Sequence, residues 1–225
     1  FSSKIISIFN MFSGIILGKK QLGGSLMKSI KEDFSLMAIL LIPVAVAINF
    51  TGFGIVKLLQ LPIFLDSIGT VFISLIAGPW IGITTAVITS LITGSFSPEY
   101  FAFMPVSITM AFCMGILARF KFKNMIVKTI ICAFSLVAIA ILVSAPIIVY
   151  VYGGNTGNAT AGITAFFLAT GSNIWNAVFS TNLITETTDK IITAIVAMAI
   201  IKAMSARYLI KFKYGENYIK SDKNV

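Results

Sequence analysis

The sequence contains no histidine, only two cysteines and few charged residues, since Asp, Glu, Lys and Arg make up 11% of its 225 residues. Cys113 and Cys132 lie in separate apolar stretches and form no CxxC pair. The chain therefore lacks the usual zinc ligands and the bases of His-dependent catalysis. We expect no enzyme activity, no metal and no cofactor. A GxxxxGK[ST] phosphate-binding loop is also missing, so any ATP-driven step needs a partner protein.

Apolar residues are abundant instead. They make up 57% of the chain, and the mean hydropathy is +0.97. These values indicate an all-α integral membrane protein. A spanning helix needs about 20 apolar residues, so the length allows roughly six spans and little mass outside the bilayer. The net charge of +9 comes from Lys and Arg between the apolar runs. We interpret these residues as topology signals facing anionic lipid, and we expect no nucleic-acid partner.

The chain divides into three parts. In residues 1–31, the stretch "KIISIFNMFSGIILGKK" has apolar residues at helical spacing, but its apolar run is too short to span. It predicts an amphipathic helix in the membrane interface, with an unstructured tail as the alternative. Residues 32–210 form the predicted membrane domain, and 211–225 a basic cytoplasmic tail. Because the sequence starts with Phe1, we expect further residues to precede it.

Basic clusters set the predicted topology. They precede the first span, follow the fourth and follow the last, so all three should be cytoplasmic, as should both termini. An even number of spans must then separate the second cluster from the third. The polar stretch 161–183 therefore becomes an outer or re-entrant helical lid, because amides facing lipid are costly. The predicted spans are 35–57, 64–78, 79–95, 101–118, 125–151 and 187–206.

Four carboxylates flank the predicted spans on the outer side, namely Asp66, Glu99, Glu186 and Asp189. Their convergence suggests a binding site, although local ion pairs with Lys57 and Lys190 are the alternative. For Asp66 we expect capping of the second span, with ligand binding beside Ser67 as the other possibility.

Amides and one aromatic residue extend the candidate site on the same side. The loop "YGGNTGNATAG" carries Asn155 and Asn158, which suit either ligand binding or an ordinary exposed turn. In the lid, Trp175 beside Asn176 suits an interfacial anchor or a wall that stacks on a ligand.

Small residues repeat at every fourth position along the third span, at Gly78, Gly82, Ala86, Ser90 and Gly94. This pattern allows close approach of helix backbones. It predicts either packing within the chain or a smooth surface for a partner subunit.

Three stretches together resemble the substrate-binding S component of energy-coupling factor (ECF) vitamin transporters. They are "LPIFLDSIGTVFISLIAGPWIG", "SAPIIVYVYGGNTG" and "NLITETTDKIITAIVA". The resemblance implies six helices that capture a scarce micronutrient from outside and deliver it inward with a T-type membrane scaffold and two ATPases. The Ala-x-x-x-Ala motif often found on the first helix of these proteins is not clean in "LMAILLIPVAVA", so the third span becomes the candidate docking face.

The predicted function is therefore that of a non-catalytic capture subunit in the bacterial plasma membrane, for a vitamin-like or porphyrin-like ligand. The absence of histidine favours the vitamin-like ligand over haem. A standalone secondary transporter is one alternative, but we find no internal repeat and expect no acid at mid-span. A membrane sensor or scaffold is the other. The predicted binding residues are Asp66, Ser67, Glu99, Asn155, Asn158, Trp175, Asn176, Glu186 and Asp189.

Overall fold

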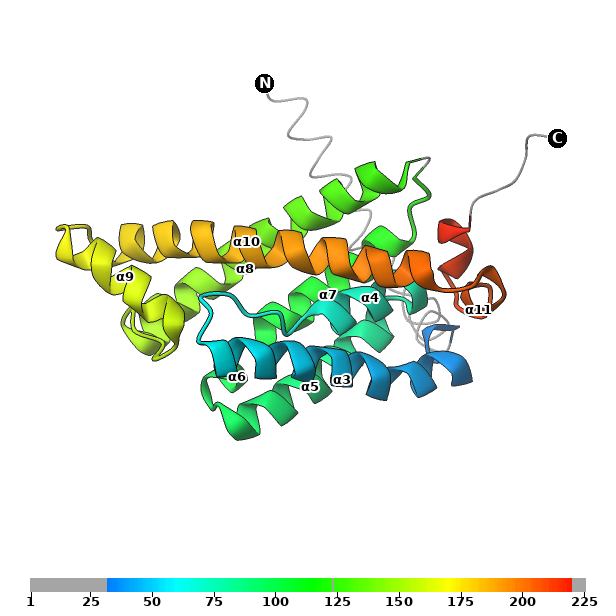
Figure 1. Cartoon of the computed structure of the whole chain (residues 1–225), viewed down its shortest axis with the longest axis horizontal. Coiled ribbons are helices and arrows are strands. Elements are labelled where there is room, and N and C mark those ends of the chain that lie inside the picture. The colour runs from blue at the N-terminus through cyan, green and yellow to red at the C-terminus, as the bar shows by residue number, and fades with distance from the viewer. Residues whose placement is uncertain (1–31, 123, 220–225) are drawn as a thin grey trace, which may run out of the picture.

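The computed structural model describes residues 32–122 and 124–219, and within these ranges the ordered elements are all helices (Figure 1). The predicted all-α class is confirmed for this part of the chain. The segment 1–31, predicted to be an interfacial helix, lies outside the described residues. The elements are α3 (Leu36–Leu59), α4 (Ile68–Ala77), α5 (Pro79–Phe96), α6 (Glu99–Ala102), α7 (Met104–Ala118), α8 (Met125–Tyr152), α9 (Ala159–Ala169), α10 (Ile174–Ala203), α11 (Ala206–Leu209) and the 3-10 turn η1 (Gly215–Tyr218).

Three helices, α3, α5 and α8, are long and apolar enough to cross a membrane. Helix α10 has 30 residues and a length of about 45 Å at 1.5 Å per residue, but it carries charged residues near its centre. Helices α4 and α7 are apolar and shorter. The chain is thus a helical membrane protein. That α4, α7 and α10 complete a set of six spans stays a prediction.

The boundaries predicted for the lid and the last span are wrong. We expected one lid helix over 161–183 and a new span from 187, but the chain turns between α9 and α10, and α10 then runs unbroken from Ile174 to Ala203 (Figure 1). Gly171 allows the turn because its φ is 87°. Asn173 then caps the start of α10 through its side chain.

Hydrogen bonds within the bundle explain how α10 can carry polar residues that we expected to be too costly in a membrane-spanning helix. Asn182 Nδ2 donates a hydrogen bond to Ser144 Oγ of α8 at 2.9 Å. Thr181 Oγ1 accepts one from Thr164 Oγ1 of α9 at 3.0 Å. All four residues are buried. The cost of exposing amides to lipid does not arise, because these groups pair inside the bundle.

Helix α4 is the centre of the bundle, and each of its ten residues is buried. It packs against α3, α5, α7 and α10. The crossing with α3 is close, because a Cβ built on Gly69 would lie 2.0 Å from Ala45 O. The helix ends at Gly78, whose φ of 113° suits glycine, and the proline that follows starts α5.

The described part of the predicted basic tail, residues 211–219, packs against the C-terminal ends of α4 and α7. Three hydrogen bonds join it to helix ends: Tyr214 N donates to Ile76 O (2.9 Å), Tyr218 Oη donates to Leu75 O (3.1 Å), and Asn217 Nδ2 donates to Ala118 O (2.8 Å). We call this the basic end, because the ends of α7 and α10, the start of α8 and the segment after α10 bring seven cations of the described residues there, namely Arg119, Lys121, Lys128, Lys202, Arg207, Lys211 and Lys213.

Candidate functional site

A hollow forms at the other end of the bundle because α4 starts late. Gly69, near its first turn, lies against Ala45 in the middle of α3. The loop 60–67 therefore runs back along the C-terminal half of α3, where a Cβ on Gly52 would lie 1.9 Å from Leu65 O. In a membrane protein, irregular backbone at this depth has to be buried or to line a cavity.

Asn49 of α3 fixes the start of α4. Its side-chain oxygen accepts hydrogen bonds from Gly69 N at 2.6 Å and Thr70 N at 3.4 Å. Its Nδ2 donates to Thr70 Oγ1 and Thr89 Oγ1, and the side chain is fully buried. Asn49 thus satisfies backbone N–H groups that the first turn of a helix leaves unpaired. The cap that we predicted for Asp66 is not seen: Ser67 is the N-cap residue, and Asp66 makes no capping hydrogen bond.

Asp189 of α10 holds the loop above α4. Its Oδ1 accepts hydrogen bonds from Leu65 N at 2.8 Å and Phe64 N at 3.3 Å. Its Oδ2 accepts one from Lys190 Nζ. Asp189 is fully buried, and Leu65 has a φ of 51°, a conformation that these contacts stabilise. Asp189 therefore anchors the loop, and both of its oxygens are already occupied.

An inner pocket lies between the loop, α7, α8 and α10. Its volume is about 50 Å³. Carboxylates from three elements reach it: Asp66 from the loop, Glu99 from α6 and Glu186 from α10. The aromatic walls are Phe64, Tyr100 and Phe103, and the other lining residues are Val106, Ser107, Met110, Ser144, Ile148, Thr156, Asn158, Thr160 and Lys190.

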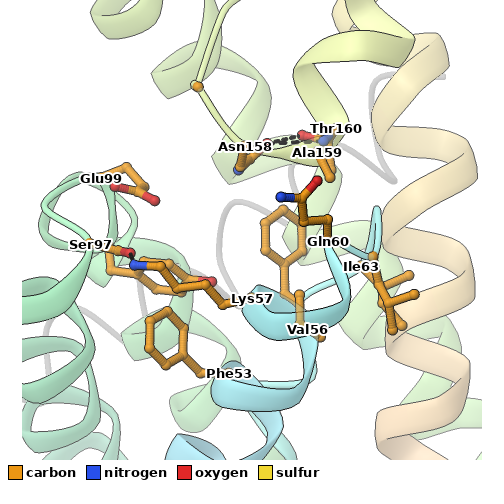
Figure 2. A pocket seen from close by; sticks show the side chains of 14 residues that line it. Phe53, Val56, Lys57, Gln60, Ile63, Ser97, Glu99, Asn158, Ala159 and Thr160 are labelled. Carbon is orange, nitrogen blue, oxygen red and sulfur yellow. Dashed lines mark hydrogen bonds between the residues drawn. The ribbon is translucent and has the colours of Figure 1, made fainter.

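A wider outer pocket of about 470 Å³ adjoins the inner one. Figure 2 shows Lys57 directed toward Ser97, with Glu99 and Asn158 on the facing elements. Lys57 Nζ donates hydrogen bonds to Ser97 Oγ and Phe96 O, so its ammonium group is already paired with α5. The two pockets adjoin, because five residues line both, namely Phe64, Glu99, Tyr100, Asn158 and Thr160.

Charge in the inner pocket is unbalanced. Lys190 is buried and pairs directly with Asp189. Its Nζ lies 3.4 Å from Glu186 Oε2, beyond the about 2.7–2.9 Å of a strong charged hydrogen bond. Glu186 Oε2 has no hydrogen-bond partner among the described residues, although the side chain is only 7% exposed. Three carboxylates, those of Asp66, Glu186 and Asp189, thus share one ammonium group.

The predicted site residues fall into two groups. Asp66, Glu99, Asn158 and Glu186 line one pocket, and Asp189 supports it from behind. The other four do not line it: Ser67 is buried outside it, Asn155 borders a separate shallow hollow, and Trp175 and Asn176 lie at the start of α10. Trp175 packs against Tyr150 and Phe179 and lines neither the inner nor the outer pocket, so its role as an interfacial anchor stays a prediction.

The small-residue stripe packs within the chain, which favours the first of its two interpretations. Gly82, Ala86, Ser90 and Gly94 are buried. A Cβ on Gly82 would lie 1.9 Å from Ser74 Oγ of α4, and one on Gly94 would lie 2.7 Å from the Phe101 ring. A partner subunit would therefore have to dock on another face in this conformation.

Sequence reasoning missed Asn49 and underrated the aromatic residues of the pocket. Asn49 is a lone amide within an apolar helix, and a buried amide of this kind needs partners, so it could have been found. Lys190 was treated only as a partner in local ion pairs. Tyr100 and Phe103 carry no such signal, because aromatic residues are abundant and most face lipid or core.

No protein family, curated protein or solved structure matches this chain. The fold and the site therefore define its class on their own. It is a helical membrane protein with an acidic, aromatic-walled pocket at one end of the bundle.

Proposed function

We propose that the chain is the substrate-capturing S component of an ECF-type importer and binds a small vitamin-like or porphyrin-like molecule. The observation that carries the proposal is the pocket itself. Polar side chains from the loop 60–67, from α6, from the loop that precedes α9 and from α10 line two adjoining hollows. A volume of about 470 Å³ lies in the range of small-molecule sites, which is about 300–1,000 Å³.

The proposed topology places the pocket outside the cell and the basic end in the cytoplasm, following the positive-inside rule. Both termini are then cytoplasmic, in a bacterial plasma membrane. In this proposal the chain catalyses no reaction. A T-type membrane scaffold and two ATPases supply the energy, consistent with the missing phosphate-binding loop.

The test is affinity purification of the full chain from its native membrane, followed by identification of bound proteins and small molecules. We expect a scaffold protein, two subunits that carry phosphate-binding loops, and a small molecule. Recovery of the chain with no ATPase and no small molecule, under conditions that preserve a known ATPase complex, would reject the proposal.

A second candidate is a standalone secondary transporter. We expected no acid at mid-span, but Glu186, Asp189 and Lys190 lie near the middle of α10 and are buried. Charged groups inside transmembrane helices often mark substrate or ion pathways. Vesicles containing only this chain distinguish the two candidates: uptake of the extracted small molecule that stops when ion gradients are dissipated would favour the secondary transporter.

A further inference from the structure

We propose that the pocket selects a small organic cation: an aromatic or heteroaromatic molecule with a positively charged N–H group that pairs with Glu186 and Asp66. This inference rests on the proposed function, because it names the chemical class of the captured ligand. It assigns Glu186 the direct contact and leaves Asp189 as the support of the loop.

The first observation is that Glu186 Oε2 accepts no hydrogen bond from the described residues, and that its one charged partner is Lys190 at 3.4 Å, whose ammonium group is hydrogen-bonded to Asp189. A carboxylate removed from water needs hydrogen bonds or an opposite charge, and leaving it without them costs several kcal/mol. Glu186 is 5% exposed, lines the inner pocket, and its Oε2 has no hydrogen-bond partner in the described part of the chain. A ligand N–H group placed in the pocket would supply the missing donor.

The second observation is that the neighbouring cation is occupied. Lys190 Nζ donates to Asp189 Oδ2, and Asp189 also binds the loop backbone. Lys190 therefore balances the anchoring carboxylate and leaves Asp66 and Glu186 without a full counter-charge. An anionic ligand would meet these two carboxylates at close range, which is repulsive in a buried site.

The walls of the pocket suit an organic cation. The inner pocket of about 50 Å³ has room for the charged N–H group alone, and the ring of the ligand would lie in the outer pocket, because Phe64 and Tyr100 line both. Aromatic faces attract cations within about 6 Å of the ring centroid and stack on flat rings. Within the described residues, no group of three carboxylate or thiol side chains is close enough to hold a metal ion. The geometry therefore favours an organic cation over a metal.

The test compares three probes that share an indole ring and differ in the group at the end of the side chain. Tryptamine carries an ammonium group, tryptophol a hydroxyl group and indole-3-acetate a carboxylate. We expect calorimetry on the full chain in detergent to show tryptamine binding about tenfold or more tightly than tryptophol, because a charged hydrogen bond contributes about 1.5–3 kcal/mol. Indole-3-acetate should bind more weakly than tryptophol.

One pocket variant and one control variant test whether the preference for tryptamine arises in the pocket. Glu186→Gln keeps the shape and removes the charge, and should reduce the preference for tryptamine to less than about threefold. Glu216→Gln is the matched control, because Glu216 is exposed in η1 at the basic end, and it should keep the full preference. If Glu186→Gln fails to fold, Asp66→Asn decides and should weaken tryptamine binding alone.

Any of four outcomes overturns the cation inference. They are equal binding of tryptamine and tryptophol, tightest binding of indole-3-acetate, binding of none of the three probes, and a preference for tryptamine that survives in both pocket variants. Native mass spectrometry of the protein as purified separates this failure from failure of the proposed function. A bound neutral or anionic molecule rejects only the cation, whereas no bound molecule together with no probe binding rejects both.

Discussion

At the residue scale, adjacent acids on α10 have different tasks. Both oxygens of Asp189 accept hydrogen bonds, from Lys190 and from the loop backbone, whereas Glu186 Oε2 accepts none in the described part of the chain. The sequence predicted both as ligand-binding residues, because neither spacing nor polarity distinguishes them. The difference comes from the loop 60–67, which is far away in the sequence and donates backbone hydrogen bonds to Asp189 but not to Glu186.

Replacing Asp189 tests this division. Asp189→Ala removes the hydrogen-bonded partner of the buried Lys190 and the acceptor of Leu65 N. We expect the free energy of unfolding to fall by about 3–5 kcal/mol, measured by chemical denaturation in detergent. Glu186→Gln should lower it by less than about 1 kcal/mol, because the variant loses the 3.4 Å salt bridge with Lys190 but also removes the cost of burying a carboxylate that accepts no hydrogen bond through Oε2. Equal losses in the two variants would contradict the assignment.

Asn49 gives a second prediction at this scale. Asn49→Ala leaves Gly69 N and the hydroxyl of Thr70 without their buried partner. We expect a loss of about 2–4 kcal/mol and faster hydrogen exchange at residues 69 and 70. Asn176→Ala is the control. Asn176 is exposed in the first turn of α10, so its replacement should change the free energy of unfolding by less than about 0.5 kcal/mol.

At the element scale, the start of α4 decides whether there is a pocket. The sequence predicted a span over 64–78, but α4 begins at Ile68, and the residues before it form the pocket loop. Local pattern could not place this boundary, because the cap comes from Asn49 on another helix. The same holds for α10, whose polar residues pair with α8 and α9 in ways that composition does not reveal.

A replacement of Gly69 tests how closely α4 packs against α3. Gly69→Ala would place a Cβ 2.0 Å from the backbone oxygen of Ala45, so α3 and α4 would have to separate. We expect a lower melting temperature, weaker ligand retention and a free energy of unfolding lower by about 1–3 kcal/mol. Gly162→Ala is the matched control, because nothing lies within 4 Å of its added Cβ and alanine favours the helix. A Gly69→Ala protein as stable as the control would show that the crossing is looser than described.

At the scale of the whole molecule, the pocket and the basic end lie at opposite ends of the bundle, and among the described residues Lys57 and Lys190 are the cations that line the pocket side. The basic end is closed by the segment after α10 and by Asp33, which lies just before α3. Asp33 accepts hydrogen bonds from Trp80 N at the start of α5 and from Lys213 Nζ at 2.7 Å. Burial raises the pKa of Asp33, and Lys213 opposes that rise. The class of protein was predictable from composition, but this closure was not, because the tail looked like a solvated basic segment.

A replacement of Lys213 tests whether its ion pair with Asp33 stabilises the basic end. Lys213→Ala leaves the buried carboxylate of Asp33 without its cation, and we expect a loss of about 1–3 kcal/mol, since Lys213 itself is partly exposed. The double variant with Asp33→Asn should recover much of this loss, because no buried charge remains. Additive losses in the denaturation cycle would show that the two side chains act independently.

The central claim is that the hollow above α4 holds a small molecule through Glu186 and Asp66. Native mass spectrometry of the full chain, purified in mild detergent from the membrane in which it works, tests it most directly. We expect one bound small molecule per chain, lost in Glu186→Gln and retained in Glu216→Gln. A bound molecule that survives equally in both variants would contradict it.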